Sequence, residues 1–347
     1  MHYRAFLLTG AFLGLLVPVA VSAPAPEYHV VKTIPLTGDG GWDYLSIDGA
    51  AHRLYISRGT HVMVVDIDKG EQVGDIPDTQ GVHGIAIDHA LNRGFTSNGG
   101  ANSVTPFDLK TLKADAPVSV GQGPDCILFD PGSNRVFTFN GRSQDSTAID
   151  ADSEKVAGTI ALGGRPEFAA ADGRGHVYVN IEDKSEIVQI DSKALTVLNR
   201  WPIAPGDSPS GLSIDSRHHR LFSTCHNNMM VVMDADTGKV IATPAIGRGT
   251  DASAFDPKTG LAFSSNGDGT LTVVQEKDPN TFEVAQNVTT EPGARTMALD
   301  PKTHSIYLCT AKIDTTPPPA GQEQGQGPQR FRRRFVPGSF HLIVVGE

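Results

Sequence analysis

Seven polar residues occupy the same place in a repeated motif, and their side chains are the best candidates in the chain for binding a ligand. Each lies five residues before an Asp that ends a short apolar segment. They are Asp43, His83, Asp125, Glu167, Ser210, Asp251 and Arg295. Four carboxylates held close together repel one another, so such a set lowers its free energy by binding a cation, by sharing protons or by pairing with the Arg and the His.

Divalent cations fit these side chains in two ways. Carboxylate oxygens suit calcium or magnesium, whereas an imidazole such as that of His83 favours zinc or another transition metal. We therefore expect a divalent cation as cofactor, with Asp125, Glu167 and Asp251 as its ligands. The alternative that these residues bind no ligand also remains open, because the lining of a solvated channel can be polar without binding anything.

Further side chains should share this face, since each repeat places another loop there after its second apolar segment. The predicted additional ligand contacts are Asn98, Asn140, His226 and Asn266, with Arg58 and Glu182 at equivalent positions. Trp42 and Tyr44 flank Asp43 and could add an apolar wall. The sequence contains none of the short motifs of serine hydrolases, zinc proteases or phosphate-binding loops.

The repeat that positions these residues has seven units. Its closing aspartates are Asp48, Asp88, Asp130, Asp172, Asp215, Asp256 and Asp300, which are 40 to 44 residues apart. Apolar residues alternate before each Asp, as a strand requires, and a turn follows. Each unit then has a strand centred on an aromatic residue, a third strand that ends in Asp in five units, and a fourth, clearest at 155–160 and 239–243.

Four short antiparallel strands per forty residues make one blade of a propeller. The sequence therefore predicts an all-β fold, a seven-bladed β-propeller. The last unit supplies only three strands, at 297–299, 306–309 and 340–345, and residues 28–34 can supply the fourth. We expect this N-terminal outer strand to close the ring, because an open sheet edge invites aggregation.

The units resemble the YVTN-repeat β-propellers, whose periplasmic members are called YncE-like. The resemblance rests on Gly163-Gly164-Arg165-Pro166, on Tyr178-Val179-Asn180 and on the run from Asp234 to Val240, Asp-Ala-Asp-Thr-Gly-Lys-Val. It covers nearly all of the chain after residue 23 and implies the fold. YncE-like proteins are associated with DNA binding, but propellers host binding proteins and enzymes alike, so the resemblance implies no particular activity.

The first 23 residues read as a secretory signal. Arg4 is followed by an apolar run from Ala5 to Val21, and Val21-Ser22-Ala23 supplies small residues for cleavage. The run is short for a membrane span, which needs about 20 unbroken apolar residues. We expect a periplasmic or secreted protein comprising residues 24–347, without a membrane span and monomeric.

Residues 311–337 interrupt the last unit with a segment rich in Pro, Gln and Gly, which we expect to form a mobile insertion. It contains the cluster Arg330-Phe331-Arg332-Arg333-Arg334. The chain as a whole carries a formal charge of −10, which opposes the binding of nucleic acid anywhere but at this cluster. Cys126, Cys225 and Cys309 form no Cys-x-x-Cys pair and read as small buried side chains.

Three functions remain open from the residues alone. The first is a scaffold that binds a small molecule, a metal or a protein partner at the mouth of the central channel. The second is a metal-dependent hydrolase or lyase, similar to propeller lactonases, that acts on a metal-activated water. The third is binding of nucleic acid or a surface through the Arg-rich insertion.

Overall fold

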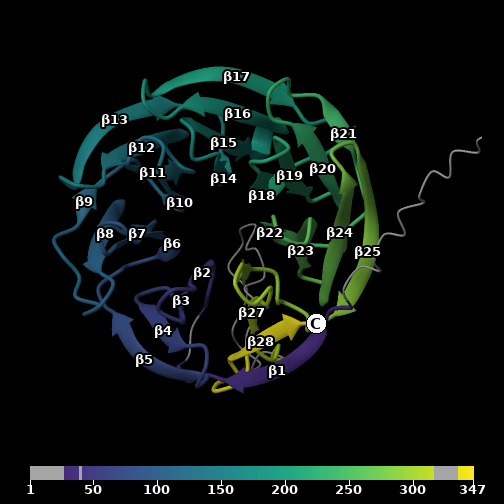
Figure 1. The fold of residues 1–347 in the computed structure, drawn as a ribbon. Helices are drawn as coiled ribbons and strands as arrows, with labels where there is room; N and C mark the ends of the chain where they lie inside the picture. The colour runs from purple at the N-terminus through teal and green to yellow at the C-terminus, as the bar shows by residue number, and fades with distance from the viewer. Residues whose placement is uncertain (1–26, 39–40, 316–334) are drawn as a thin grey trace, which may run out of the picture.

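The computed structural model describes residues 27–38, 41–315 and 335–347. Seven four-stranded antiparallel sheets are arranged as blades around a central axis, which confirms the predicted propeller (Figure 1). The signal segment and the Arg330–Arg334 cluster lie outside the described residues, so both remain predictions.

In six blades the strands run from the axis to the rim in chain order, and in the seventh the rim strand is β1 (His29–Pro35). The innermost strands are β2 (Leu45–Asp48), β6 (Val82–Asp88), β10 (Pro124–Asp130), β14 (Pro166–Ala171), β18 (Pro209–Asp215), β22 (Thr250–Asp256) and β26 (Met297–Leu299). The second strands are β3 (Arg53–Ser57), β7 (Arg93–Asn98), β11 (Arg135–Asn140), β15 (His176–Ile181), β19 (Arg220–Cys225), β23 (Leu261–Asn266) and β27 (Ile306–Thr310).

The two outer positions complete each sheet. The third strands are β4 (Val62–Asp66), β8 (Ser103–Asp108), β12 (Asp145–Asp150), β16 (Glu186–Asp191), β20 (Met229–Asp234), β24 (Thr270–Asp278) and β28 (His341–Gly346). The rim strands are β5 (Glu71–Ile76), β9 (Val118–Ser119), β13 (Lys155–Ala161), β17 (Thr196–Pro202), β21 (Val240–Ala242), β25 (Thr281–Thr289) and β1 (His29–Pro35). One short 3-10 helix, η1 (Glu182–Lys184), follows β15. No helix in the described ranges is long and apolar enough to cross a membrane.

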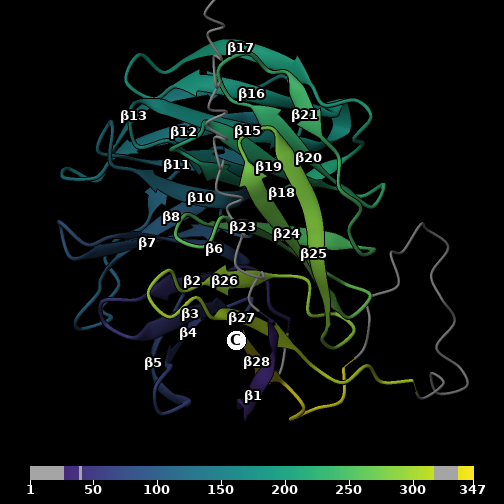
Figure 2. The ribbon, with the colours of Figure 1, turned by 45° about the vertical axis from the view of Figure 1, so that its right-hand side comes forward.

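The N-terminal strand closes the ring as predicted. β1 pairs antiparallel with β28, so the seventh blade has the order β1-β28-β27-β26, and Figures 1 and 2 both show β1 beside β28. Tyr28, which is 1% exposed, anchors this strand to the sixth blade. Its ring packs edge-on against Phe263 at 5.3 Å between centroids, and its backbone N–H donates to Gln286 at 2.9 Å.

The core lies between the blades, where the second and third strands are buried. Its largest side chains are the aromatic residues of the second strands, which are almost fully buried at Tyr55, Phe95, Phe137, Phe222 and Phe263. Rim strands such as β5 and β13 expose most of their residues. Packing against neighbouring blades therefore stabilises each sheet on both faces.

The repeated aspartates are turn-forming residues, which explains their regular recurrence. The buried carboxylate of Asp48 accepts hydrogen bonds from the backbone N–H groups of Ala50 and Ala51, at 3.1 and 2.8 Å. The third-strand residue Asp234 binds the N–H groups of Asp236 and Thr237 in the same way. An Asp side chain that binds N–H groups two and three residues ahead stabilises a tight turn.

The three cysteines are buried and unpaired, as the sequence predicts: Cys126, Cys225 and Cys309. Burial raises the pKa of each thiol, which keeps the sulfur protonated and unreactive at neutral pH.

Candidate functional site

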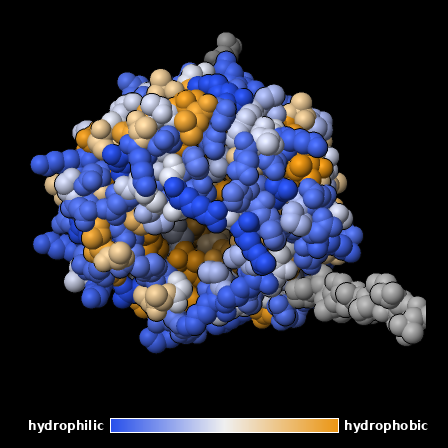
Figure 3. Space-filling model, turned by 45° about the horizontal axis from the view of Figure 1, so that its top comes forward, coloured by the Kyte–Doolittle hydropathy of each residue, from blue (hydrophilic) through white to orange (hydrophobic). Residues whose placement is uncertain are grey.

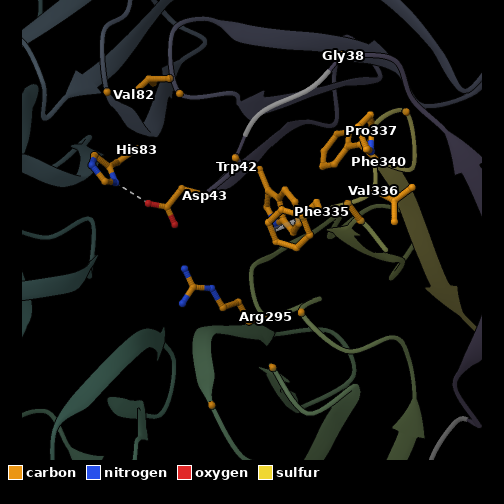
Figure 4. Close-up of a pocket in the computed structure, with 18 of the residues that line it drawn as sticks. Gly38, Trp42, Asp43, Val82, His83, Arg295, Phe335, Val336, Pro337 and Phe340 are labelled. Carbon is orange, nitrogen blue, oxygen red and sulfur yellow. Dashed lines mark hydrogen bonds and ion pairs between the residues drawn. The ribbon is translucent and has the colours of Figure 1, made fainter. Parts of the chain in front are cut away.

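A cavity of about 1330 Å³ opens at the end of the channel where the innermost strands begin. Figure 3 shows the molecule hollowed near the centre of the face in view, with apolar residues inside the hollow and hydrophilic residues around it. Three of the seven predicted ring residues, Asp43, His83 and Arg295, line the cavity. Figure 4 shows the His83 ring directed toward Asp43, with the guanidinium of Arg295 facing the same open space.

Local backbone geometry explains why one position in every blade faces the channel. In five blades the ring residue lies at a register shift between the innermost and second strands, as between Val82 and Ile85 or between Pro124 and Ile127. Such β-bulges bend the strand and redirect a side chain that regular pairing would hold elsewhere.

The backbone of several ring residues is also held by the preceding blade. Ser97 of β7 donates a hydrogen bond to the carbonyl of Asp125, and Ser265 of β23 donates to the carbonyl of Arg295. The amide of Asn180 in β15 does the same for Ser210, at 2.8 Å. The ring residues are therefore positioned by contacts between blades, on a rigid part of the scaffold.

Asp43, His83 and Asp125 form the tightest group in the ring. His83 Nδ1 lies 2.5 Å from Asp43 Oδ2 and 3.4 Å from Asp125 Oδ1, and one ligand atom from each residue falls within 4.8 Å of the others. Burial lowers the pKa of His83, but the hydrogen bond to Asp43 and the charge of Asp125 outweigh it and raise that pKa to about 9. Burial raises the pKa of Asp125 to about 7, against the opposing charge of His83.

A second group joins Ser210, Asp251 and Arg295 across three consecutive blades. Arg295 Nε lies 3.1 Å from Asp251 Oδ2, and Ser210 Oγ donates to Asp251 Oδ1 at 3.1 Å. Burial raises the pKa of Asp251 to about 6, although the charge of Arg295 opposes the shift. Asp251 is thus already neutralised by a cation within the protein.

Glu167 is half-buried and Tyr44 is buried, next to the other ring residues. Burial, and then the charges of Asp125 and Asp251, raise the pKa of Glu167 well above its usual range. The buried ring of Tyr44 packs edge-on against Phe168 at 5.0 Å. These two aromatic residues belong to the first and fourth blades, so their contact crosses the channel.

An aromatic wall borders the cavity on the side opposite His83 in Figure 4. Trp42 packs against Phe335 and Phe340, with ring centroids 4.8 and 5.2 Å away, and the guanidinium carbon of Arg58 lies 3.6 Å from the centroid of Phe340. Phe335 belongs to the end of the predicted insertion, whose residue Ile313 forms a β-bridge with it. The described ends of the insertion therefore return to the channel mouth.

The predicted ring residues are thus brought to one channel, but the predicted metal ligands are not gathered into one set. Among the described residues, the groups of three that could hold a metal are Asp43, His83 and Asp125, and a second group far from this mouth. Asp125, Glu167 and Asp251 do not form such a group. The geometry instead favours Asp43 and His83 as partners of Asp125, although the sequence predicts neither of them as a metal ligand.

The asparagines predicted to contact the ligand, which end the second strands, instead form hydrogen bonds within their own blades. Asn98, Asn140 and Asn266 are at most 1% exposed, and each side chain is hydrogen-bonded to hydroxyl groups of its own hairpin, as Asn98 is to Thr96 and Thr105. His226 is exposed. The signal for a structural role was visible in the sequence, since a Thr or Ser precedes each Asn by two residues.

Comparison with known proteins identifies the architecture. No family model and no curated protein matches the chain. Similar solved structures are the hydrazine synthase of Kuenenia stuttgartiensis, with a TM-score of 0.69 and 14% identity over 79% of this chain and 94% of that one, and U3-55K, with a TM-score of 0.72 and 10% identity over 93% and 99%. At such identity the likeness shows the fold alone.

Proposed function

We propose that this chain is an exported propeller of the YVTN-repeat, YncE-like type that binds a small molecule at its channel mouth through a divalent cation. The observation that carries the proposal is the convergence of Asp43, His83 and Asp125 beneath a cavity of about 1330 Å³. The chain's export and its family membership rest on the sequence patterns described above.

The ligand atoms indicate which cation fits. One imidazole nitrogen and two carboxylate oxygens form a mixed set that suits zinc or manganese better than calcium, which prefers six or more oxygens. Three protein ligands leave coordination positions free for water or a bound molecule, as in open zinc sites. A metal cation there would displace the proton that makes His83 positively charged and the proton that Asp125 holds below its pKa of about 7.

The cavity walls indicate the class of the small molecule. Trp42, Phe335 and Phe340 offer an apolar surface. The bound cation, and the guanidinium of Arg295 beside its partner Asp251, would offer positive charge on the facing side. An organic carboxylate with an apolar or aromatic part matches this arrangement, because its two ends meet complementary surfaces.

Calorimetric titration with zinc, manganese and calcium tests the cation site. We expect the chain to bind zinc or manganese more tightly than calcium, and we expect His83→Asn and Asp125→Asn each to weaken that binding at least tenfold. Asp68→Asn is the matched control, because Asp68 forms a 2.8 Å pair with His52 on the surface, away from the channel. Unchanged affinity in both mouth variants would contradict the proposal.

The hydrolase alternative would use the same metal, so turnover of a lactone panel by the zinc-loaded protein distinguishes it from binding alone. We rank binding first because the comparisons and the fold support a scaffold and add nothing specific to catalysis. Binding of nucleic acid through Arg330–Arg334 stays a separate prediction, since those residues lie outside the described ranges.

A further inference from the structure

A second cluster of metal-ligating side chains lies away from the channel mouth, between the fifth and sixth blades. His218 Nδ1 is 2.7 Å from Asp215 Oδ2 and 2.8 Å from Glu276 Oε1, and one ligand atom of each residue lies within 4.8 Å of the other two. Asp215 ends β18, whose ring residue Ser210 lies five positions earlier. At about 3.3 Å per residue, Asp215 lies at most roughly 17 Å along the strand from the ring position of its own blade.

His218 departs from the pattern of the other blades. It occupies the third position after the repeated Asp, where three other blades have a hydroxyl residue that donates a hydrogen bond to the Asp carboxylate. These residues are Ser133, Thr259 and Thr303. An imidazole at this position is longer than a hydroxymethyl group and reaches the next blade.

Glu276 is a second and independent departure from the repeat. Its backbone N–H donates to Gly260, as the residue after the third-strand Asp does in other blades. The equivalent residues are small or apolar: Ile67, Leu109, Ala151, Ser192 and Ala235. A Glu here places a carboxylate where the fold otherwise places a core side chain, directly against the His that departs in the neighbouring blade.

The two carboxylates of the cluster are buried, and one of their oxygens lacks a hydrogen-bond partner. Glu276 is 8% exposed and Asp215 2%, and Glu276 Oε2 has no hydrogen-bond partner among the described residues. Two carboxylates and one imidazole leave this site short of positive charge, and a buried carboxylate oxygen without a partner is costly. The His218 side chain is 33% exposed, so an ion could enter from solvent.

We propose that Asp215, His218 and Glu276 form a second divalent-metal site that links the fifth and sixth blades. Two carboxylates and one imidazole suit zinc or manganese, and two of the ligands come from one turn and the third from the adjacent sheet. A metal bound there would supply the missing positive charge and coordinate the unpartnered oxygen. It would stabilise the interface between the blades and take no part in ligand binding at the mouth.

The repeat supplies variants that should fold. Glu276→Ala introduces the residue found at the equivalent positions 151 and 235, and His218→Thr introduces the residue found at 259 and 303. His304→Asn is the matched control. His304 also contacts a buried carboxylate, Asp256 at 2.5 Å, but it belongs to no group of three ligands in the described chain, and Asn92 and Asn134 occupy its equivalent positions.

Metal binding is measured in an Asp125→Asn background, so that the result does not depend on the mouth site. With a 100-fold excess of free zinc over its dissociation constant, we expect one bound equivalent and a melting temperature raised by roughly 4 °C, because the unfolding entropy of a chain of this length is large. His304→Asn should retain both effects. Glu276→Ala and His218→Thr should each fold, lose the bound equivalent and lose the shift.

Equal zinc binding with and without Glu276→Ala would overturn this inference, as would no binding in the Asp125→Asn background. Failure of the mouth proposal gives a different result. In that case the wild-type chain binds one equivalent, Asp125→Asn leaves it unchanged, and Glu276→Ala removes it.

Discussion

Replacing Asp125 by Asn should stabilise the metal-free protein, although Asp125 is a proposed ligand. Burial raises the pKa of this carboxyl from its ordinary value of 3.8 to about 7 in the folded chain. Between these two pH values the folded state holds a proton that the unfolded state has lost. The wild-type chain therefore gains stability as the pH falls from 7 toward 4, and it loses that contribution as the pH rises to 7.

The size of the effect follows from the shift. Roughly three pH units at about 1.4 kcal/mol per unit give about 4 kcal/mol as an upper limit at pH 8. The shift already includes the attraction to His83, but water reaching the partly exposed carboxyl reduces the effect, so we expect Asp125→Asn to raise the unfolding free energy by about 1 to 3 kcal/mol at pH 8. At pH 4, where the folded state holds an uncharged carboxyl at position 125 in the wild type and an uncharged amide in the variant, the two proteins should differ little.

Urea unfolding at pH 4, 6 and 8 in the presence of a chelator measures the difference, with Asp68→Asn as the control. The gain should grow between pH 4 and pH 7 and then level off. A gain that is equal at all three pH values would refute the reasoning, because it would show that the stabilisation does not come from titration. A loss of stability at pH 8 would refute it as well, since Asp125 would then be stabilising in its charged form.

Three other predictions concern the scaffold and its export. Gly94→Ala should destabilise the fold by about 2 kcal/mol in urea unfolding, because the added Cβ would lie 2.1 Å from Phe107, and Phe107→Val in the same chain should recover part of that loss. Tyr28→Ala should cost about 3 to 5 kcal/mol by the same assay, because it removes a buried ring that holds the closing strand. Mass spectrometry of protein from the native host should show a chain that starts near Pro24, and an intact Met1 would contradict export.

The fold could be predicted because its signals recur seven times. Each repeated Asp stabilises a turn formed by the next few residues. Because every blade needs this turn, Asp recurs at a regular spacing in the sequence, and the number of repeats gives the number of blades. Even the closing strand was predictable, since a three-stranded last unit needs a fourth strand and only one apolar segment was left to supply it.

The site was predicted less completely, for two physical reasons. Register shows that Asp43, His83 and Asp125 face one channel, but it does not show which of seven ring residues touch one another. The wall at Phe335 comes from a segment outside the repeat, where periodicity carries no information. The same limit applies to Glu276, whose departure from the pattern is visible in the sequence while its contact with His218 depends on how the blades pack.

The pairing of β1 with β28 determines when, during synthesis, the seventh blade can fold. β1 is the first and β28 the last strand that the structure describes, so the seventh blade cannot form until β28 has been synthesised. Until then β1 lacks its hydrogen-bonding partner, and an unpaired strand is aggregation-prone. The delay fits the export that we propose, because a ring that closes only after β28 has arrived leaves the chain unfolded until then.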